Sequence, residues 1–389
     1  MANVLGAYNV EFFANEALIW LQKALGISSR VHMGYDEERK SFGKGDTITI
    51  RRPGKFTAQT APGAAAAVST EKVQILLTSH KEVRFEVLDK ELAWTTDRII
   101  REHIGPAAYG LADQIDQDGW ALYKDIPHTV SVAGAKVAIV DLTTVAQKMF
   151  DNEVPMVAAD QGLLRFGVGS LEKNELLQLD AFNQFQGAGE EGVALQRTGN
   201  LGRKFGFDFF ATQNRPTHTA GALTSTSPDL VGAHAKGATT IVLDDTTQTG
   251  TVKKGDILTI TGDTHPYAIA ADATASGNSI TLTINAPGLR QAAADNALVT
   301  ITQEATNTKN NVAFHRDAFA LAFAPLPMFD QYQTRLGQEM FTQTDPNSGL
   351  SLRARIYADG DNAKVVVVLD ALYGWKTLNE DLAVRFLNA

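Results

Sequence analysis

Hydrophobic residues near the beginning of the chain recur every three or four positions, which is the spacing of one face of an α-helix. The members of this stripe are Val10, Phe13, Ala14, Ala17, Leu18, Leu21 and Leu25. Asn9 suits the N-cap of such a helix, and Gly26 suits the glycine that often follows the last turn. Phe12 and Trp20 lie outside the stripe. We therefore expect apolar side chains on more than one face, with either the chain's own domain or another subunit as the second neighbour.

Residues 42–87 alternate between polar and apolar positions and predict a long β excursion. The alternation is clearest in 47–50, and 73–77 and 83–87 have the pattern of returning strands. Between them, residues 60–67 read Thr-Ala-Pro-Gly-Ala-Ala-Ala-Ala and hold nothing large enough to bury. We expect this tip to be mobile or held by a partner.

A longer helical pattern follows, with an interruption at Gly105-Pro106. We expect one helical segment over 95–103 and a second that begins at Pro106, a residue suited to the first helical turn, and ends near Lys124. Its apolar face carries Leu111, Ile115 and Leu122. We expect its aspartates to lie mostly on the solvated side, namely Asp113, Asp116 and Asp118.

From residue 130 to 210, short apolar runs alternate with helical pieces and indicate a mixed α/β body. We predict strands at 136–140, 163–168 and 205–210, and a helix at 142–150.

Residues 222–310 differ in kind from their flanks. Between Phe210 and Phe314 the chain has neither phenylalanine nor tryptophan, and Tyr267 is its single tyrosine there. Because aromatic side chains dominate protein cores, this stretch cannot share the core of its flanks. Its alternating runs predict strands at 239–243, 257–261, 280–284 and 298–302. We interpret it as an inserted small antiparallel barrel or sandwich that folds autonomously. Beyond it, strands are expected at 350–357 and 364–369, joined by a turn.

Composition limits the function classes. A chain of 389 residues is long enough for two or three domains. It has no signal-peptide pattern and no apolar run near the roughly 18 residues that cross a bilayer, so we expect a soluble, intracellular product without membrane contact. The absence of cysteine excludes disulfides and thiolate chemistry. A net charge of −9 argues against a dedicated nucleic-acid binder.

The search for catalytic motifs yields structural interpretations. Residues 187–192 match a dinucleotide-binding string without the preceding strand, and 315–317 lack the rest of a kinase catalytic loop. Residues 359–362 begin like a calcium loop but favour a hairpin turn. Ser170 is not in a nucleophile elbow, and the eight histidines have no metal-ligand spacing. We expect no catalytic residues, no cofactor and no metal, in a protein that acts through its surfaces.

Basic residues are densest around the start of the long helix. They are Lys72, Lys81, Arg84, Arg98 and Arg101. Acidic residues alternate with them, which favours a solvated face over a weak phosphate-binding surface.

Two segments resemble bacteriophage coat proteins. The first is Asn311-Val-Ala-Phe-His-Arg-Asp-Ala-Phe-Ala-Leu-Ala322; the second is Leu369-Asp-Ala-Leu-Tyr-Gly-Trp-Lys-Thr-Leu378, followed by Asp381-Leu-Ala-Val-Arg385. The order of parts along nearly the whole chain also resembles the phage P-twenty-two coat-protein family, which has the Hong Kong 97-type (HK97-like) capsid fold. The insert is shorter than the longest versions in that family.

The resemblance implies an α+β HK97-like fold with peripheral and axial domains and an inserted small antiparallel β-barrel. Its implied parts are an N-terminal arm (1–35), an extended β loop (36–87), a spine-helix region of the peripheral domain (88–130), an axial and peripheral α/β body (131–221), the inserted barrel (222–310) and a return to the body (311–389).

The function that this resemblance implies is that of a major capsid protein of a tailed double-stranded DNA phage. Such a protein assembles with itself into hexamers and pentamers of an icosahedral shell. It is expected in the virion after assembly in the host cytoplasm, with a scaffolding protein and a portal as partners and weak non-specific contact with packaged DNA. Candidate inter-subunit contacts are Phe12, Phe13, Leu18, Trp20, Pro62, Gly63, Arg98 and Arg101. The alternatives are a tail, adaptor or decoration protein that uses the insert for recognition, and a hydrolase with an unrecognised site.

Overall fold

A computed structural model of the chain describes residues 10–33, 47–52, 71–88, 100–155, 163–183, 198–304, 308–328, 338–346, 348–359 and 364–388. The chain forms two units. The first comprises Met1–Gly119 with Phe319–Leu378, and the second comprises Trp120–Ala318 with Asn379–Ala389. Each unit thus combines segments that are far apart in the sequence.

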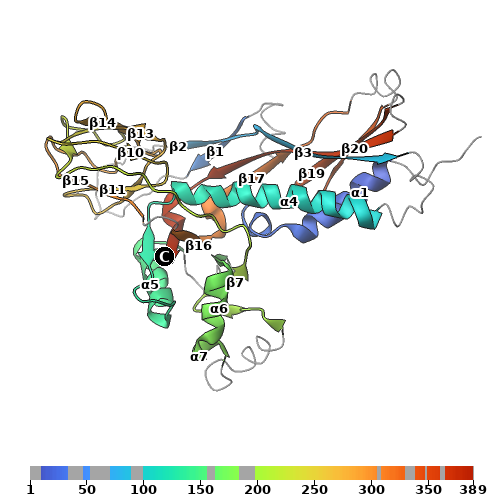
Figure 1. The fold of residues 1–389 in the computed structure, drawn as a ribbon, viewed down its shortest axis with the longest axis horizontal. Helices are drawn as coiled ribbons and strands as arrows, with labels where there is room; N and C mark the ends of the chain where they lie inside the picture. Colours follow the sequence, from blue (N-terminus) through green and yellow to red (C-terminus); the bar gives the residue numbers. More distant parts are fainter. Residues whose placement is uncertain are drawn as a thin grey trace, which may run out of the picture. The chain divides into compact units, whose positions relative to one another are not determined.

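A five-stranded antiparallel sheet is the centre of the first unit (Figure 1). Its strands are β17 (Phe319–Ala324), β20 (Lys364–Thr377), β19 (Ser351–Asp359), β18 (Gln338–Thr344) and β3 (Ser79–Leu88). Strand β20 pairs with β19 along one edge, while β17 and β3 share the other. The predicted strand 364–369 is therefore only the first part of a fourteen-residue strand. The predicted turn after β19 leads into an antiparallel partner, and its residues 360–363 lie outside the described ones.

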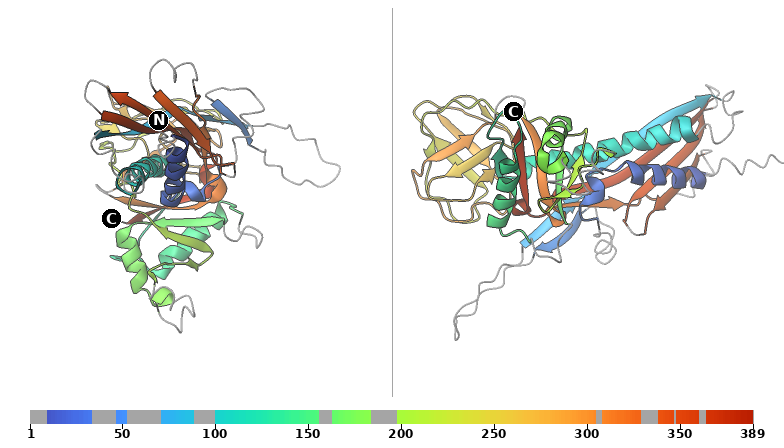
Figure 2. Two further views of the ribbon diagram at one scale, coloured as in Figure 1. Left: turned by 90° about the vertical axis from the view of Figure 1, so that its right-hand side faces the viewer. Right: turned by 90° about the horizontal axis from the view of Figure 1, so that it is seen from below.

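Two helices lie on one face of this sheet (Figures 1 and 2). Helix α1 (Val10–Ala24) packs against β18 and β19, and its apolar stripe is buried as predicted. A π-helical turn, Ile100–Ile104, runs directly into α4 (Gly105–Trp120) and on into a 3-10 helix, Ala121–Asp125. The predicted second segment corresponds to α4, which begins at Gly105 with Pro106 in its first turn, and the predicted interruption takes the form of a change from π-helix to α-helix at this point.

Asp116 corrects the expectation that the aspartates of α4 face solvent. Its side chain is buried and accepts hydrogen bonds from the N–H of Gly26 at 2.6 Å and from the N–H of Ser28 at 3.1 Å. The Ser28 hydroxyl donates to the same carboxylate. The chain after α1 is therefore fixed by this carboxylate, which takes the N–H of Gly26.

The hairpin of β1 (Thr47–Arg52) and β2 (Glu71–Leu76) covers the opposite face of the sheet, against alternate residues of β17 and β20. Its cluster contains Ile48, Ile50, Ile75, Leu77, Ala320, Ala322 and Ala324. The third predicted strand of the β excursion belongs to β3 and thus to the central sheet. Residues 60–67 lie outside the described part of the chain.

A six-stranded mixed sheet organises the second unit. In spatial order its strands are β4 (Thr129–Ser131), β21 (Ala383–Asn388), β16 (Lys309–His315), β5 (Leu164–Val168), β7 (Phe207–Ala211) and β6 (Arg203–Lys204). The predicted strands 163–168 and 205–210 correspond to β5 and β7. Strands β16 and β21 pair directly, which places Val312–Phe314 of the first coat-like segment opposite Ala383–Arg385, part of the stretch that follows the second.

Helices α5 (Ile139–Asp151), α6 (Ser170–Gln178) and α7 (Asp180–Asn183) share the apolar core of this sheet with a group of packed phenylalanines. The predicted strand 136–140 is wrong. Asp141 accepts a hydrogen bond from the N–H of Ala138 at 2.9 Å, which begins α5 inside the apolar run.

Residues 222–310, which we call the insert, contain three small antiparallel sheets among the described residues. The eight strands are β8 (Asp229–Leu230), β9 (Thr240–Asp244), β10 (Thr251–Val252), β11 (Ile257–Ile260), β12 (Tyr267–Ala268), β13 (Ala273–Thr274), β14 (Ser279–Thr283) and β15 (Val299–Thr302). The four predicted strands are β9, β11, β14 and β15. The sheets enclose an apolar cluster of aliphatic residues and Tyr267, separate from the phenylalanine core.

Candidate functional site where the insert meets the body

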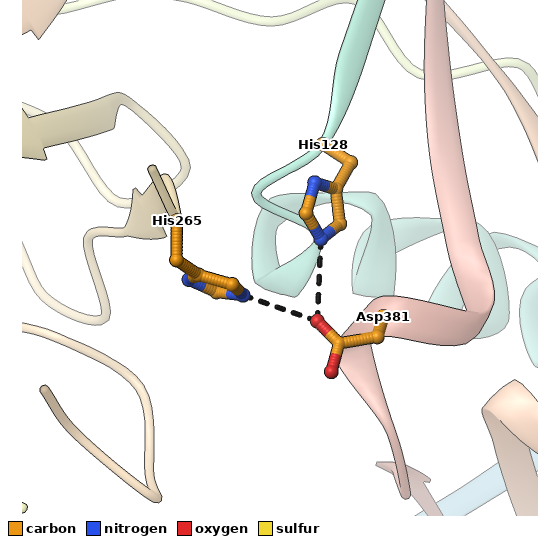
Figure 3. A group of neighbouring side chains, drawn as sticks. All are labelled: His128, His265 and Asp381. Carbon is orange, nitrogen blue, oxygen red and sulfur yellow. Dashed lines mark hydrogen bonds and ion pairs between the residues drawn. The ribbon is translucent and has the colours of Figure 1, made fainter. Parts of the chain in front are cut away.

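Two histidines and an aspartate from three distant segments converge in the second unit (Figure 3). His128 immediately precedes β4, His265 lies between β11 and β12 of the insert, and Asp381 lies in a 3-10 turn, Glu380–Leu382, before β21. The Nε2 atoms of His128 and His265 lie 3.2 and 3.1 Å from the same oxygen, Oδ1 of Asp381. The two imidazole rings meet edge to face at 5.2 Å. Three side chains that are far apart in the sequence are therefore in direct contact.

Arg290 of the insert holds the other side of this carboxylate. Its Nη2 lies 2.8 Å from Oδ2 of Asp381 and 3.2 Å from Oε1 of Glu380. Burial raises the pKa of Asp381, but the hydrogen bonds from His128 and His265 and the charge of Arg290 together bring that pKa well below its usual range. Burial, with the neighbouring charge of Asp381, raises the pKa of Glu380 to about 6. Asp381 is therefore the stable anion of the group.

Within the insert, hydrogen bonds around its single tyrosine, Tyr267, position His265 and Arg290, the two residues that contact Asp381. Tyr267 donates from its hydroxyl to Oδ2 of Asp263 at 2.5 Å and accepts the backbone N–H of Arg290 at 2.9 Å. Oδ1 of Asp263 accepts the backbone N–H of His265 at 2.9 Å. Burial raises the pKa of Tyr267, so its hydroxyl keeps its proton and serves as a donor. Tyr267 thus links the backbone of both insert residues.

A second polar cluster centres on Arg385 of β21, whose side chain is completely buried. Its Nε donates to the carbonyl of Ile126 at 2.7 Å and its Nη2 to the carbonyl of Gly255 at 2.8 Å. Its Nη1 donates to Oε1 of Glu304 at 3.0 Å, and its guanidinium stacks 5.9 Å from the ring of Tyr123. Because Gly255 and Glu304 belong to the insert, one buried cation fastens the insert to the body sheet.

His218 continues this cluster. Its Nδ1 lies 3.0 Å from the Tyr123 hydroxyl, and its Nε2 lies 3.0 Å from Oδ1 of Asp256, with both His218 and Asp256 buried. The other oxygen of Asp256 accepts the N–H groups of Gly221 and Lys253. A carboxylate inside the insert is therefore satisfied partly by a residue that precedes it in the chain.

The chemistry of both clusters is that of attachment: carboxylates accept hydrogen bonds from guanidinium and imidazole groups across the boundary of the insert. Sequence reasoning missed them because their members are far apart in the chain, with 38 residues between His218 and Asp256 and 116 between His265 and Asp381. The one signal in the sequence was Tyr267 itself, because it is the single tyrosine in a stretch without phenylalanine or tryptophan.

The predicted contact residues of α1 have different environments. Phe12 is 41 % exposed, whereas Phe13 and Leu18 are buried within the first unit. Trp20 is partly buried, and the Lys23 ammonium lies 5.6 Å from the centre of its ring. Phe13 and Leu18 therefore serve the chain's own core, which leaves Phe12 as the candidate of this helix most open to a second subunit.

Most of the other predicted contact residues lie outside the part of the chain that the structure describes. Pro62, Gly63 and Arg98 lie outside the described residues, as does the segment 187–192. Arg101 belongs to the π-helical turn, and its side chain is outside the described part. Residues 315–317 end β16 and enter a 3-10 turn, with His315 buried but Arg316 and Asp317 exposed. The proposed inter-subunit contacts of Pro62, Gly63, Arg98 and Arg101 remain predictions.

Among the described helices, none combines the length and apolarity that a bilayer crossing requires. Comparison with protein families and with curated proteins finds no match.

The chain is similar in structure to bacteriophage capsids. A structure from Mycobacterium phage Che8 aligns with 13 % identity and a TM-score of 0.49, covering 93 % of this chain and 90 % of that one. The capsid of cyanophage P-SCSP1u aligns with 12 % identity and a TM-score of 0.45, covering 90 % and 85 %. The mature capsid of bacteriophage PhiM1 aligns with 13 % identity and a TM-score of 0.45, covering 88 % and 82 %.

Proposed function

We propose that this chain is the major capsid protein of a tailed double-stranded DNA bacteriophage, and that it assembles into the hexamers and pentamers of an icosahedral shell. The observation that carries the proposal is the location of the coat-like segments. Residues 311–322 form β16, a short 3-10 turn and most of β17, and residues 369–378 fall mainly in β20. The resemblance thus falls on the strands that build both sheets and not on surface loops.

The order of the remaining parts supports the same function. An amphipathic helix, a β hairpin, a long helix across a sheet and an insert with its own core follow one another along the chain. A shell needs many repeated contacts, each weak, between copies of one chain. The exposed apolar side chains Phe12 and Ile19 on α1 suit such a contact.

A scaffolding protein, a portal and packaged DNA are the partners we propose for this assembly, with the DNA held weakly. The net charge of −9 suits a weak and non-specific DNA contact, because a tight one requires clustered cations. Assembly is proposed to occur in the host cytoplasm, without any enzymatic step by this chain.

Electron microscopy of the expressed protein tests the proposal. The chain is expressed alone and together with a scaffolding protein from the same genome, and we expect capsomers or closed shells in at least one condition. The variant Phe12→Asp should reduce assembly, while Glu11→Gln on the same exposed face should not. Discrete monomers under every condition overturn the proposal. Monomers that bind a target and lose this binding when residues 222–310 are deleted instead identify a tail, adaptor or decoration protein.

A further inference from the structure

We propose that His128, His265 and Asp381 form a binding site for a divalent transition-metal cation of the zinc class. The ligand atoms that these three residues offer all lie within 4.8 Å of one another. Figure 3 shows both rings turning an Nε2 edge toward the same carboxylate oxygen. The spacing of these residues in the sequence does not indicate a metal site, because His265 belongs to the insert whereas His128 and Asp381 lie outside it.

The ligand types and separations match such a cation. Zinc binds imidazole nitrogen and carboxylate oxygen at about 2.0–2.2 Å, so two ligands of a tetrahedral centre lie roughly 3.4 Å apart. The two observed distances from Nε2 to Oδ1 are 3.2 and 3.1 Å. These two separations are within a few tenths of an ångström of the spacing that a cation requires, and all three ligand atoms lie within 4.8 Å of one another.

Both rings are free to make this adjustment. The Nδ1 atoms of His128 and His265 are buried and have no hydrogen-bond partner among the described atoms. Neither ring is therefore held in one orientation by a second hydrogen bond. A cation would replace the two hydrogen bonds from Nε2 to Oδ1 of Asp381, with each neutral ring carrying its proton on Nδ1 instead, and no other hydrogen bond of either ring would be lost.

Arg290 orients the third ligand. By holding Oδ2 of Asp381 at 2.8 Å, the guanidinium leaves Oδ1 directed toward the imidazoles. Partners of this kind in the outer shell of a metal site typically fix the ligand geometry. When ionised, Glu380 and Asp381 carry two negative charges against the single positive charge of Arg290, so the group as a whole favours an added cation.

The site has access to solvent for a fourth ligand. The side chains of His265 and Asp381 are 15 % and 18 % exposed, whereas that of His128 is 4 % exposed. One open side is what a centre with three protein ligands and a water requires. The cation would join the insert, through His265, to the body, through His128 and Asp381.

Titration of the purified full-length chain tests this proposal. Tag-free protein, treated with a chelator and kept unassembled, is titrated with Zn²⁺ by calorimetry and with Co²⁺ by visible absorption. We expect saturation at one equivalent, the absorption of tetrahedral Co²⁺, and a higher unfolding temperature with metal. Absence of saturable binding overturns the proposal. Because the protein is unassembled, this result is independent of whether the chain forms shells.

Variants identify the ligands. His265→Gln should weaken binding by more than about 100-fold, since outer-shell partners alone are typically worth about 10–100-fold. Arg290→Lys should weaken it by about 10-fold for the same reason. His234→Gln, a histidine of the insert outside the cluster, is the control. If His265→Gln unfolds without metal, His128→Gln replaces it. Equal affinity in the wild type and in a folded ligand variant assigns the metal elsewhere and overturns the site.

Discussion

Arg385 and Glu304 form an ion pair, 3.0 Å from Nη1 to Oε1, in which the side chains are 0 % and 2 % exposed. A buried charge is costly to remove from water unless its partner and further hydrogen bonds compensate it. Two backbone carbonyls, of Ile126 and Gly255, accept hydrogen bonds from Nε and Nη2 of the same guanidinium. The attachment of the insert therefore depends on the Arg385 guanidinium keeping its buried carboxylate partner, Glu304.

Replacing Glu304 should reveal this dependence. Glu304→Gln preserves the shape but leaves the Arg385 charge uncompensated, and we expect a loss of about 3–5 kcal/mol in the free energy of unfolding. Urea unfolding measures it. Asp208→Asn is the control, because it removes a partly exposed pair with Arg165, and its cost should stay within about 1 kcal/mol. Equal losses in the two variants would contradict the prediction.

A glycine of β5 should not tolerate a side chain. A Cβ added to Gly167 would lie 2.8 Å from Cζ2 of Trp120 and 2.9 Å from Cζ of Phe210. Gly167→Ala should therefore lower the free energy of unfolding by about 1–3 kcal/mol through overpacking. Gly134→Ala is the matched control, since its nearest atom, the Lys136 carbonyl oxygen, lies 3.8 Å away. Thermal unfolding of both variants compares them, and an unchanged Gly167→Ala would refute the close packing.

Asp116 should make stability depend on pH. Burial raises its pKa and outweighs the hydrogen bonds from Ser28 and Gly26, which lower it. The folded protein therefore holds a proton here at higher pH than the unfolded chain, whose value is about 3.9. The contribution of this group is full below that value and is lost as pH rises through the folded pKa.

The comparison variant for this effect is Asp116→Asn, which does not titrate. The stability of the wild type minus that of the variant, measured by urea unfolding from pH 3.5 upward, should fall with rising pH and then become constant. A difference that rises with pH would show that the hydrogen bonds from Gly26 and Ser28 outweigh burial.

A fragment of the insert that includes His218 and Gly221 should be more stable than one that begins after them. The insert has its own apolar core, so residues 222–310 should unfold cooperatively when isolated. A fragment of residues 216–310 also contains His218 and Gly221, which pair with buried Asp256. It should be more stable by about 1–3 kcal/mol, the cost of an unsatisfied buried group. Urea unfolding of both fragments measures the difference. The prediction fails if neither fragment unfolds cooperatively or if their stabilities are equal.

Periodicity identified those elements whose burial follows from neighbours in the sequence. The stripe of α1 and the four insert strands are of this kind. It failed at 136–140, where a short apolar run indicated a strand but the Asp141 carboxylate begins a helix. It failed also at Asp116, because the helical pattern contains no information about Gly26 and Ser28, which lie about ninety residues away.

The polar clusters were beyond sequence reasoning for a related reason. A metal or ion-pair motif is visible in a sequence only when one short element carries several of its ligands. Here His128, His265 and Asp381 come from three elements, and the topology of β4, β11–β12 and β21 alone brings them together. The absence of a spacing pattern therefore said nothing about three-dimensional proximity.

The pairing of β3 with β20 has a consequence for synthesis on the ribosome. The Lys364 ammonium on β20 donates to Oε2 of Glu86 on β3 at 2.6 Å, yet 278 residues separate the two. At about 5–20 residues per second, β3 waits roughly 15–60 seconds for its partner to be made. In the second unit, β21 lies between β4 and β16 and is made later still. Neither sheet can therefore be completed during most of translation, which delays the appearance of fully folded chains until nearly all of the 389 residues have been joined.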